Sequence, residues 1–248
     1  TVNLKGENLV SCSLNSEVSL NKNNKGLIVV QSIATHKNGE IGKGEFVKIG
    51  EFEATETKNE ATFELKDIKL WSPDEPNLYD VKNELFVSDG SSVAKIDEKI
   101  IAVGFRKAEF KTDGFFLNGK RFKIRGLDRH QSYPYVGYAA PKSMQVFDAK
   151  VLKNELGLNA VRTSHYPQSH YFIDACDELG LLVFTEIPGW QHIGDDEWKK
   201  QAVENVKDMI KMFCNCRSLK KIDLSSFGYD SVEDMNKMFF CCESLKEL

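Results

Sequence analysis

Polar side chains that could do chemistry gather in three short stretches of the second half of the chain. These stretches span residues 126–131, 162–167 and 186–192. The side chains in them that could contact a ligand are Asp128, His130, Arg162, His165, Glu186 and Trp190. Carboxylates, imidazoles and a guanidinium brought together can bind a polar ligand or move protons. Taken singly, each could equally be structural, because buried Arg–Asp pairs and hydrogen-bonded histidines are common.

Alternating strands and helices are predicted to place these three stretches along one edge of a sheet. Residues 115–124 predict a hairpin with a turn at Asn118-Gly119, and its second half, residues 121–124, is the first strand of the series. Residues 159–163 and 181–184 predict two further strands, the last buried on both faces. Chemistry gathers at the carboxyl ends of parallel strands, where each polar stretch begins.

In the segments between these strands, apolar residues recur at helical intervals, which predicts helices. The first predicted stripe ends at Gly157 and comprises Met144, Phe147, Val151, Leu152 and Leu156. The second ends at Gly180 and comprises Phe172, Ile173, Cys176 and Leu179. A third helix is predicted to begin after a cap at Asp195 or Asp196. The order favours a parallel sheet, either doubly wound or closed into a barrel.

The first 110 residues have a different pattern, which predicts an antiparallel sandwich of immunoglobulin-like type. Short apolar or alternating segments occur at residues 27–30, 46–49, 61–65 and 81–87, and Asn38-Gly39 and Asp89-Gly90 are typical of turns. The two prolines within residues 71–76 indicate a loop. We expect this region to be structural.

The last residues repeat themselves. Residues 206–213 match residues 232–239, and residues 216–220 match residues 242–246, both 26 positions apart. The Leu219, Ile222 and Leu224 spacing within the unit is typical of leucine-rich repeats. With about one and a half copies, fewer than the three or so that such arrays need, we expect this tail to be poorly ordered or part of a longer array.

Composition excludes several classes of protein. A net charge of −4 over 248 residues disfavours a nucleic-acid binder, and no apolar run is long enough to span a membrane. The clustered cysteines Cys214, Cys216, Cys241 and Cys242 lack the usual spacing of zinc ligands, so buried free thiols are favoured over zinc or disulfides.

Residues 70–210 resemble family-two glycoside hydrolases, most closely bacterial β-galactosidases. The motifs of the resemblance occur in family order and comprise residues 70–73, 77–79, 103–106, 116–120, 125–130, 159–167 and 176–181. The resemblance implies an immunoglobulin-like domain over residues 1–110 and the N-terminal part, about three βα units, of a (β/α)8 barrel over residues 111–210. Residues 211–248 would form the leucine-rich-like repeat.

Family-two enzymes cleave β-galactosides with retention, using two glutamates about 5 Å apart. The resemblance places the acid/base in an Asn-Glu pair after the fourth barrel strand and the nucleophile near the seventh. No Asn-Glu pair in that context occurs here, so we expect no catalytic residue in this chain and no activity of the chain alone.

The resemblance instead implies substrate-binding roles. His165 is expected to donate a hydrogen bond to a sugar hydroxyl, Arg162 to pair with carboxylates, and Glu186 to order the rim. Asp128 stands where many relatives have Asn, so its direct contact with the sugar is less certain. Arg129 and His130 are expected to shape their loop, and Trp190 to stack on the sugar or pack in the core.

The expected partner is a carbohydrate, and no cofactor is expected, although a divalent or alkali cation is possible in the family. Two other functions stay open: the same hydrolase class acting on β-glucuronides or β-mannosides, and a surface or adhesion module that binds a protein partner through the repeat. The hydrolase would be cytoplasmic, whereas a genuine repeat array would be at the surface or secreted.

Overall fold

The computed structural model describes residues 1–19, 26–37, 39–55, 58–88, 91–186 and 193–202, and these residues form two compact units. The first unit comprises Thr1–Arg125 and Cys176–Leu182. The second comprises the described part of Gly126–Ala175 and Val183–Leu248. The predicted repeat over residues 211–248 and the site candidate Trp190 lie outside the described residues.

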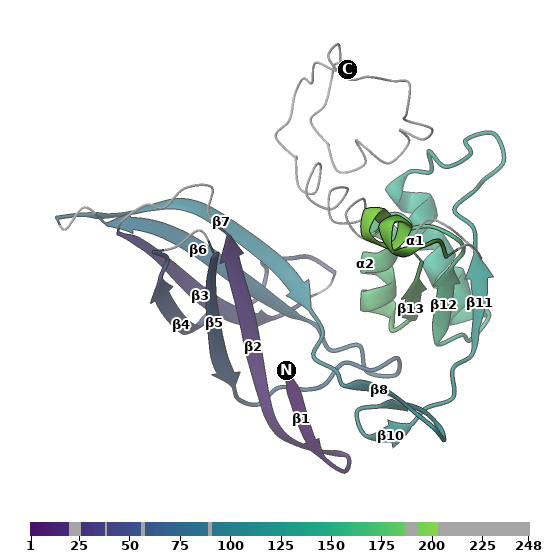
Figure 1. Cartoon of the computed structure of the whole chain (residues 1–248), viewed down its shortest axis with the longest axis horizontal. Helices are drawn as coiled ribbons and strands as arrows, with labels where there is room; N and C mark the ends of the chain where they lie inside the picture. Colours follow the sequence, from purple (N-terminus) through teal and green to yellow (C-terminus); the bar gives the residue numbers. More distant parts are fainter. Residues whose placement is uncertain (20–25, 38, 56–57, 89–90, 187–192, 203–248) are drawn as a thin grey trace. The chain divides into compact units, whose positions relative to one another are not determined.

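Two antiparallel sheets form most of the first unit (Figure 1). One has the order β1-β2-β5, with β1 over Val2–Lys5, β2 over Asn8–Ser19 and β5 over Lys58–Leu65. The other has the order β4-β3-β6-β7, with β4 over Val47–Glu53, β3 over Leu27–Thr35, β6 over Tyr79–Ser88 and β7 over Val93–Val103. All four strands predicted from the sequence in this region are present, whereas β1, β2 and β7 were not foreseen.

Alternation of buried and exposed positions explains the packing of these sheets. Along β3, Leu27, Val29 and Gln31 are buried and the residues between them are partly exposed. A core that includes Cys12, Leu14 and Val81 joins residues of both sheets. Cys12 is a buried free thiol, and burial raises its pKa.

The hairpin predicted around Asn118-Gly119 is confirmed. β9 over Gly114–Leu117 pairs with β8 over Ala108–Lys111 and with the short β10 over Lys120–Arg121. Asn118 and Gly119 both have positive φ, 51° and 82°, as a primed hairpin turn requires.

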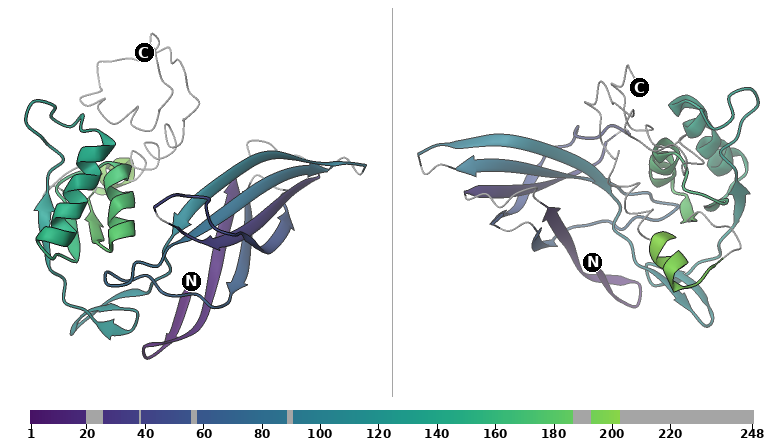
Figure 2. Two further views of the ribbon diagram at one scale, coloured as in Figure 1. Left: turned by 180° about the vertical axis from the view of Figure 1, so that it is seen from behind. Right: turned by 45° about the horizontal axis from the view of Figure 1, so that its top comes forward.

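Three strands and two helices of the second half form the start of an α/β barrel. The sheet order is β11-β12-β13, with β11 over Gly126–Arg129, β12 over Ala160–Thr163 and β13 over Leu182–Thr185. β11 and β12 are parallel. Helix α1 over Lys142–Lys150 continues into a π-helical turn over Val151–Glu155, and α2 over His170–Leu179 precedes β13 (Figures 1 and 2).

Three details differ from the sequence-based predictions. The first barrel strand is Gly126–Arg129 and not residues 121–124, so Asp128 lies within a strand and not in the loop after it. In β13, Phe184 is 36% exposed, so this strand is not buried on both faces. On α1 the fully buried residues are Gln145 and Ala149, whereas Phe147 of the predicted apolar stripe is 62% exposed. Gln145 is buried because its amide oxygen accepts a hydrogen bond from Arg129.

Helix ends follow the sequence more closely. Gly157 and Gly180 both have positive φ, 62° and 80°, after the π-helical turn and after α2. Asp195 caps the helical residues 196–202, because its carboxylate accepts a hydrogen bond from the backbone N–H of Trp198 at 2.9 Å.

Candidate functional site

Arg162 is the centre of a polar cluster built from three neighbouring strands. Arg162 lies on β12, directly opposite Asp128 on β11, and its Nη1 donates to Asp128 Oδ2 at 3.2 Å. Its Nε donates to Oε1 of Glu186, the residue that follows β13. One guanidinium therefore connects carboxylates from the first and third strands of the sheet.

His165 joins this cluster from the loop after β12, where the Ser164–His165 peptide bond is cis. Its Nδ1 lies 3.1 Å from Glu186 Oε2 and 3.4 Å from Arg162 Nη2. The carboxylate can only accept and is the nearer partner, so the proton belongs on Nδ1 and is donated to Glu186. In the neutral ring, Nε2 is then an acceptor, and it donates only when the imidazole is protonated.

The charges of the cluster reinforce one another. Partial burial raises the pKa of Glu186, but hydrogen bonds from Arg162 and His165 outweigh burial and hold that pKa below its ordinary value. The hydrogen bond to Glu186 raises the pKa of Arg162. Both groups are therefore charged across the neutral range. The cluster presents carboxylate and imidazole groups, which are the usual partners of sugar hydroxyls.

A second polar network lies beside the cluster, around the buried side chain of Arg129. Its nitrogens donate hydrogen bonds to Asp148 at 2.9 Å, Gln168 at 2.5 Å, and Tyr133 and Gln145, both at 2.8 Å. The guanidinium also lies over the Phe172 ring, 3.9 Å from its centroid.

This network holds the loops after β11 and β12 in place. Gln168 returns a hydrogen bond to the backbone carbonyl of Arg129 at 2.5 Å, and Tyr133 donates to Asp148 at 2.5 Å. Burial and then this hydrogen bond raise the pKa of Tyr133 to about 12, so its hydroxyl stays protonated at neutral pH. The loops after β11 and β12 are thus both connected to Arg129 and helix α1.

The structure brings together four of the six predicted site residues: Asp128, Arg162, His165 and Glu186. His130 lies next to them, its ring centroid 5.4 Å from that of His165. Sequence reasoning expected Arg129 to shape its loop but did not identify it as the centre of this network, because its partners are four to 39 positions away and no local spacing connects them. Its place beside Asp128, in the polar stretch 126–131, was the available signal.

Neither a metal site nor a membrane helix is evident in the described part of the chain. Within it, no group of three or more His, Cys, Asp or Glu side chains is placed to hold a metal ion. No helix among those residues is long and apolar enough to cross a membrane.

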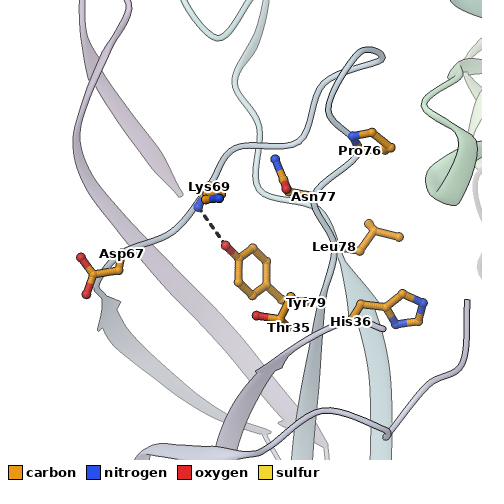
Figure 3. A pocket seen from close by; sticks show the side chains of 8 residues that line it. All are labelled: Thr35, His36, Asp67, Lys69, Pro76, Asn77, Leu78 and Tyr79. Atoms are coloured by element: carbon orange, nitrogen blue, oxygen red, sulfur yellow. Dashed lines mark hydrogen bonds between the residues drawn. The ribbon is translucent and has the colours of Figure 1, made fainter. Parts of the chain in front are cut away.

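The first unit contains a cavity of about 330 Å³ near the junction of β3 and β6 (Figure 3). Thr35, His36, Lys69 and Tyr79 are among its lining residues, and the Tyr79 hydroxyl accepts a hydrogen bond from the Lys69 backbone N–H at 2.8 Å. None of the predicted site residues lines this cavity.

Comparison with known families decides the ancestry of the chain. Residues 108–219 match the model of the glycosyl hydrolases family 2 TIM barrel domain, and residues 1–106 match a further glycosyl hydrolases family 2 model. The chain belongs to glycosyl hydrolase family 2. The immunoglobulin-like sandwich followed by the start of a TIM barrel is thereby confirmed. The barrel match extends to residue 219, past the predicted boundary at 210.

Curated family-2 relatives share clear identity with part of the chain. A β-galactosidase of Thermoanaerobacterium thermosulfurigenes is 61% identical over 146 residues, which are 59% of this chain and 20% of that protein. A β-galactosidase of Thermoanaerobacter pseudethanolicus is 55% identical over 141 residues, 56% of this chain and 18% of that protein. The chain thus spans about a fifth of the length of these relatives.

Solved structures of β-glucuronidases share the fold. The β-glucuronidase of Parabacteroides merdae superposes with a TM-score of 0.66 at 31% identity, over 85% of this chain and 26% of that one. An FMN-binding β-glucuronidase from Facaelibacterium prausnitzii gives a TM-score of 0.65 at 31% identity, over 80% of this chain and 29% of that one.

Proposed function

We propose that this family-2 chain forms the sugar-binding rim of a retaining glycosidase that acts on terminal β-D-galactosides. One observation supports this most directly: Arg162 joins Asp128 and Glu186, with His165, at one end of three neighbouring barrel strands. Chemistry in such barrels gathers at that end of the strands. Two curated relatives that are 61% and 55% identical over part of the chain are named β-galactosidases, which favours galactosides as the substrate class.

Each member of the cluster has a separate role in this proposal. Asp128 accepts hydrogen bonds from sugar hydroxyls, because a carboxylate only accepts. Arg162 keeps Glu186 ionised and holds both carboxylates in place through hydrogen bonds. His165 contacts a ring hydroxyl through Nε2, which accepts in the neutral ring because Glu186 holds the proton on Nδ1. This differs from the expected donation, which would require the protonated imidazole.

Binding and bond cleavage are separate properties in this proposal. Retaining hydrolysis takes two carboxyl groups about 5 Å apart, one as acid/base and one as nucleophile. Asp128 and Glu186 are both hydrogen-bonded to Arg162, and the lowered pKa of Glu186 makes that carboxylate unsuited to donate a proton at neutral pH. We therefore assign substrate binding, and no catalytic residue, to the described part of the chain.

A titration followed by NMR tests the proposal. Methyl 1-thio-β-D-galactoside, which resists hydrolysis, should shift the resonances of Arg162, His165 and Glu186 in the 248-residue chain. His165→Ala should abolish these shifts, whereas Phe147→Ala, on the exposed face of α1, should leave them unchanged. Equal binding by wild type and His165→Ala would contradict the proposal.

β-Glucuronides are the second candidate substrates, because the two solved structures described above are named β-glucuronidases. The charge of the cluster argues against them: two carboxylates face one guanidinium, so a glucuronate carboxylate would meet like charge. Methyl 1-thio-β-D-glucuronide should bind more weakly than the galactoside in the same titration. Tighter binding of the glucuronide would reverse the assignment.

We also propose that residues 211–248 contribute a leucine-rich-type repeat, with domain boundaries near 110 and 210. The 26-residue repeat in the sequence supports this, and such repeats stack to form binding surfaces. A protein partner bound through this segment is the second candidate function. Deletion of residues 221–248 should abolish capture of that partner and leave galactoside binding unchanged.

A further inference from the structure

A row of four aromatic rings leads from the polar cluster to the exposed loop after β11. The His165 and His130 centroids lie 5.4 Å apart with the rings at 77°. The His130 and Tyr166 centroids are 6.2 Å apart at 58°, and those of Tyr166 and Tyr138 are 5.5 Å apart at 89°. These spacings are within the range of favourable ring–ring contacts. The row therefore begins at a proposed sugar contact and ends at Tyr138, which is 44% exposed.

Hydrogen bonds hold the row in place before any ligand arrives. The Tyr166 hydroxyl accepts a hydrogen bond from the Gln131 backbone N–H at 3.0 Å. Gln131 is itself buried, and its amide oxygen accepts from the Ser169 backbone N–H at 2.6 Å. Burial, followed by a hydrogen bond with Tyr138, raises the pKa of Tyr166, so its hydroxyl stays protonated at neutral pH. A preformed wall costs little conformational entropy on binding.

The loop that bears Tyr138 is also fixed by its own backbone. Tyr133 and Gly137 exchange two hydrogen bonds, at 3.0 and 2.9 Å, and close the tip of the loop. The Tyr133 hydroxyl is anchored by Arg129 and Asp148. Tyr135 at the tip is fully exposed with a φ of 69°, and Val136 beside it is 43% exposed. A fixed loop that exposes aromatic and apolar side chains is typical of a binding surface.

We propose that His130, Tyr166 and Tyr138 form a wall beside the leaving group of a β-galactoside, and that the exposed Tyr138 ring, held edge-to-face by Tyr166, stacks against the leaving-group ring. This inference rests on the proposed function, because His165 at the near end must first bind the galactosyl unit. The wall suits any ring with a flat apolar face, which both a pyranose and an aryl group possess. A galactoside with a small alkyl leaving group would be too short to contact Tyr138.

Three hydrolysis-resistant ligands test the wall in the 248-residue chain by NMR titration. They are methyl 1-thio-β-D-galactoside, phenyl 1-thio-β-D-galactoside and thiodigalactoside, whose leaving groups are alkyl, aryl and pyranose. Tyr138→Ala should weaken the phenyl and pyranose ligands about fivefold and leave the methyl ligand unchanged, as expected for the loss of one ring contact. Tyr138→Phe, which keeps the ring, should bind like wild type. Weakening of only one of the two ring ligands would identify which leaving group the wall receives.

The controls separate failure of the wall from failure of the proposed function. Phe147→Ala removes a ring on α1 that is 62% exposed, more than that of Tyr138, and should change no affinity. If Tyr138→Ala binds all three ligands as wild type does, the wall is refuted and galactoside binding stands. If wild type binds none of them, or His165→Ala binds as well as wild type, both proposals fail. A Tyr138→Ala protein whose melting temperature falls is replaced in the test by Tyr138→Leu, which keeps bulk without an aromatic face.

Discussion

At the residue scale, Arg162 controls the charge of the candidate site. Arg162→Gln removes the strongest support for ionised Glu186, so the pKa of Glu186 should rise toward its ordinary value. Because that pKa is lowered in the folded protein, the pairing stabilises the fold above the unfolded-state pKa and is lost as pH falls through the lower, folded-state pKa. A pH titration of the Glu186 carboxyl carbon by NMR measures the change. Lys150→Gln, on exposed α1 surface, is the control, and an unchanged Glu186 pKa in Arg162→Gln would contradict the assignment.

Arg129 is the residue on which the geometry of the rim depends most. Arg129→Met keeps the apolar bulk over Phe172 but leaves Asp148, Tyr133, Gln145 and Gln168 without their shared donor. Loss of one partner from a buried ion pair typically costs about 3 kcal/mol of unfolding free energy. Urea denaturation should show a loss of that order, against a change below about 0.5 kcal/mol for the exposed Lys150→Met. A loss as small as that of Lys150→Met would show that the network is not structural.

At the element scale, the Asn118-Gly119 turn determines the hairpin that precedes the barrel strands. Gly119 has a φ of 82°, and a Cβ there would overlap the carbonyl oxygen of Gly6. Gly119→Ala should therefore lower the unfolding free energy by more than about 2 kcal/mol, since steric overlap adds to the cost of a left-handed residue. Gly6→Ala is the matched control: its φ is 63° but no atom lies near its Cβ, so only the conformational cost of about 1 kcal/mol remains. Equal losses in the two variants would rule out the overlap.

Helix α1 shows how tertiary contacts override a local pattern. Its apolar spacing predicted that Phe147 would face the core, yet Gln145 and Ala149 are the fully buried residues. The reason is energetic: the buried guanidinium of Arg129 needs acceptors, and Gln145 supplies one at 2.8 Å. Helical periodicity identified the helix correctly and its buried face only in part.

At the scale of the whole molecule, binding and catalysis should separate. The 248-residue chain should bind thiogalactosides and yet release no detectable nitrophenol from o-nitrophenyl β-D-galactoside, because its proposed site contributes contacts and no free pair of carboxyl groups. The assay compares the chain with an active β-galactosidase at equal concentration. Turnover above the buffer rate that disappears in Glu186→Gln would show that Glu186 takes part in catalysis.

The family, the alternation of strands and helices after residue 110, and the grouping of Asp128, Arg162, His165 and Glu186 could all be predicted from the sequence. These depend on short-range information: motif order, the turn residues Asn118-Gly119, and the rule that parallel strands end at one edge of a sheet. Such features can be predicted without knowledge of long-range contacts.

Which side chains hold the site in shape could not be predicted from the sequence and became clear from the packed structure. The Arg129 network, the contact of His165 with Glu186 and the ring contact between Tyr138 and Tyr166 all depend on partners distant in sequence. Hydrogen bonds and ring contacts act over a few ångströms, so their partners become definite only when the strands and helices have packed. Residue spacing could place these side chains near one edge of the sheet, but the packing of the loops and α1 selected which of them meet.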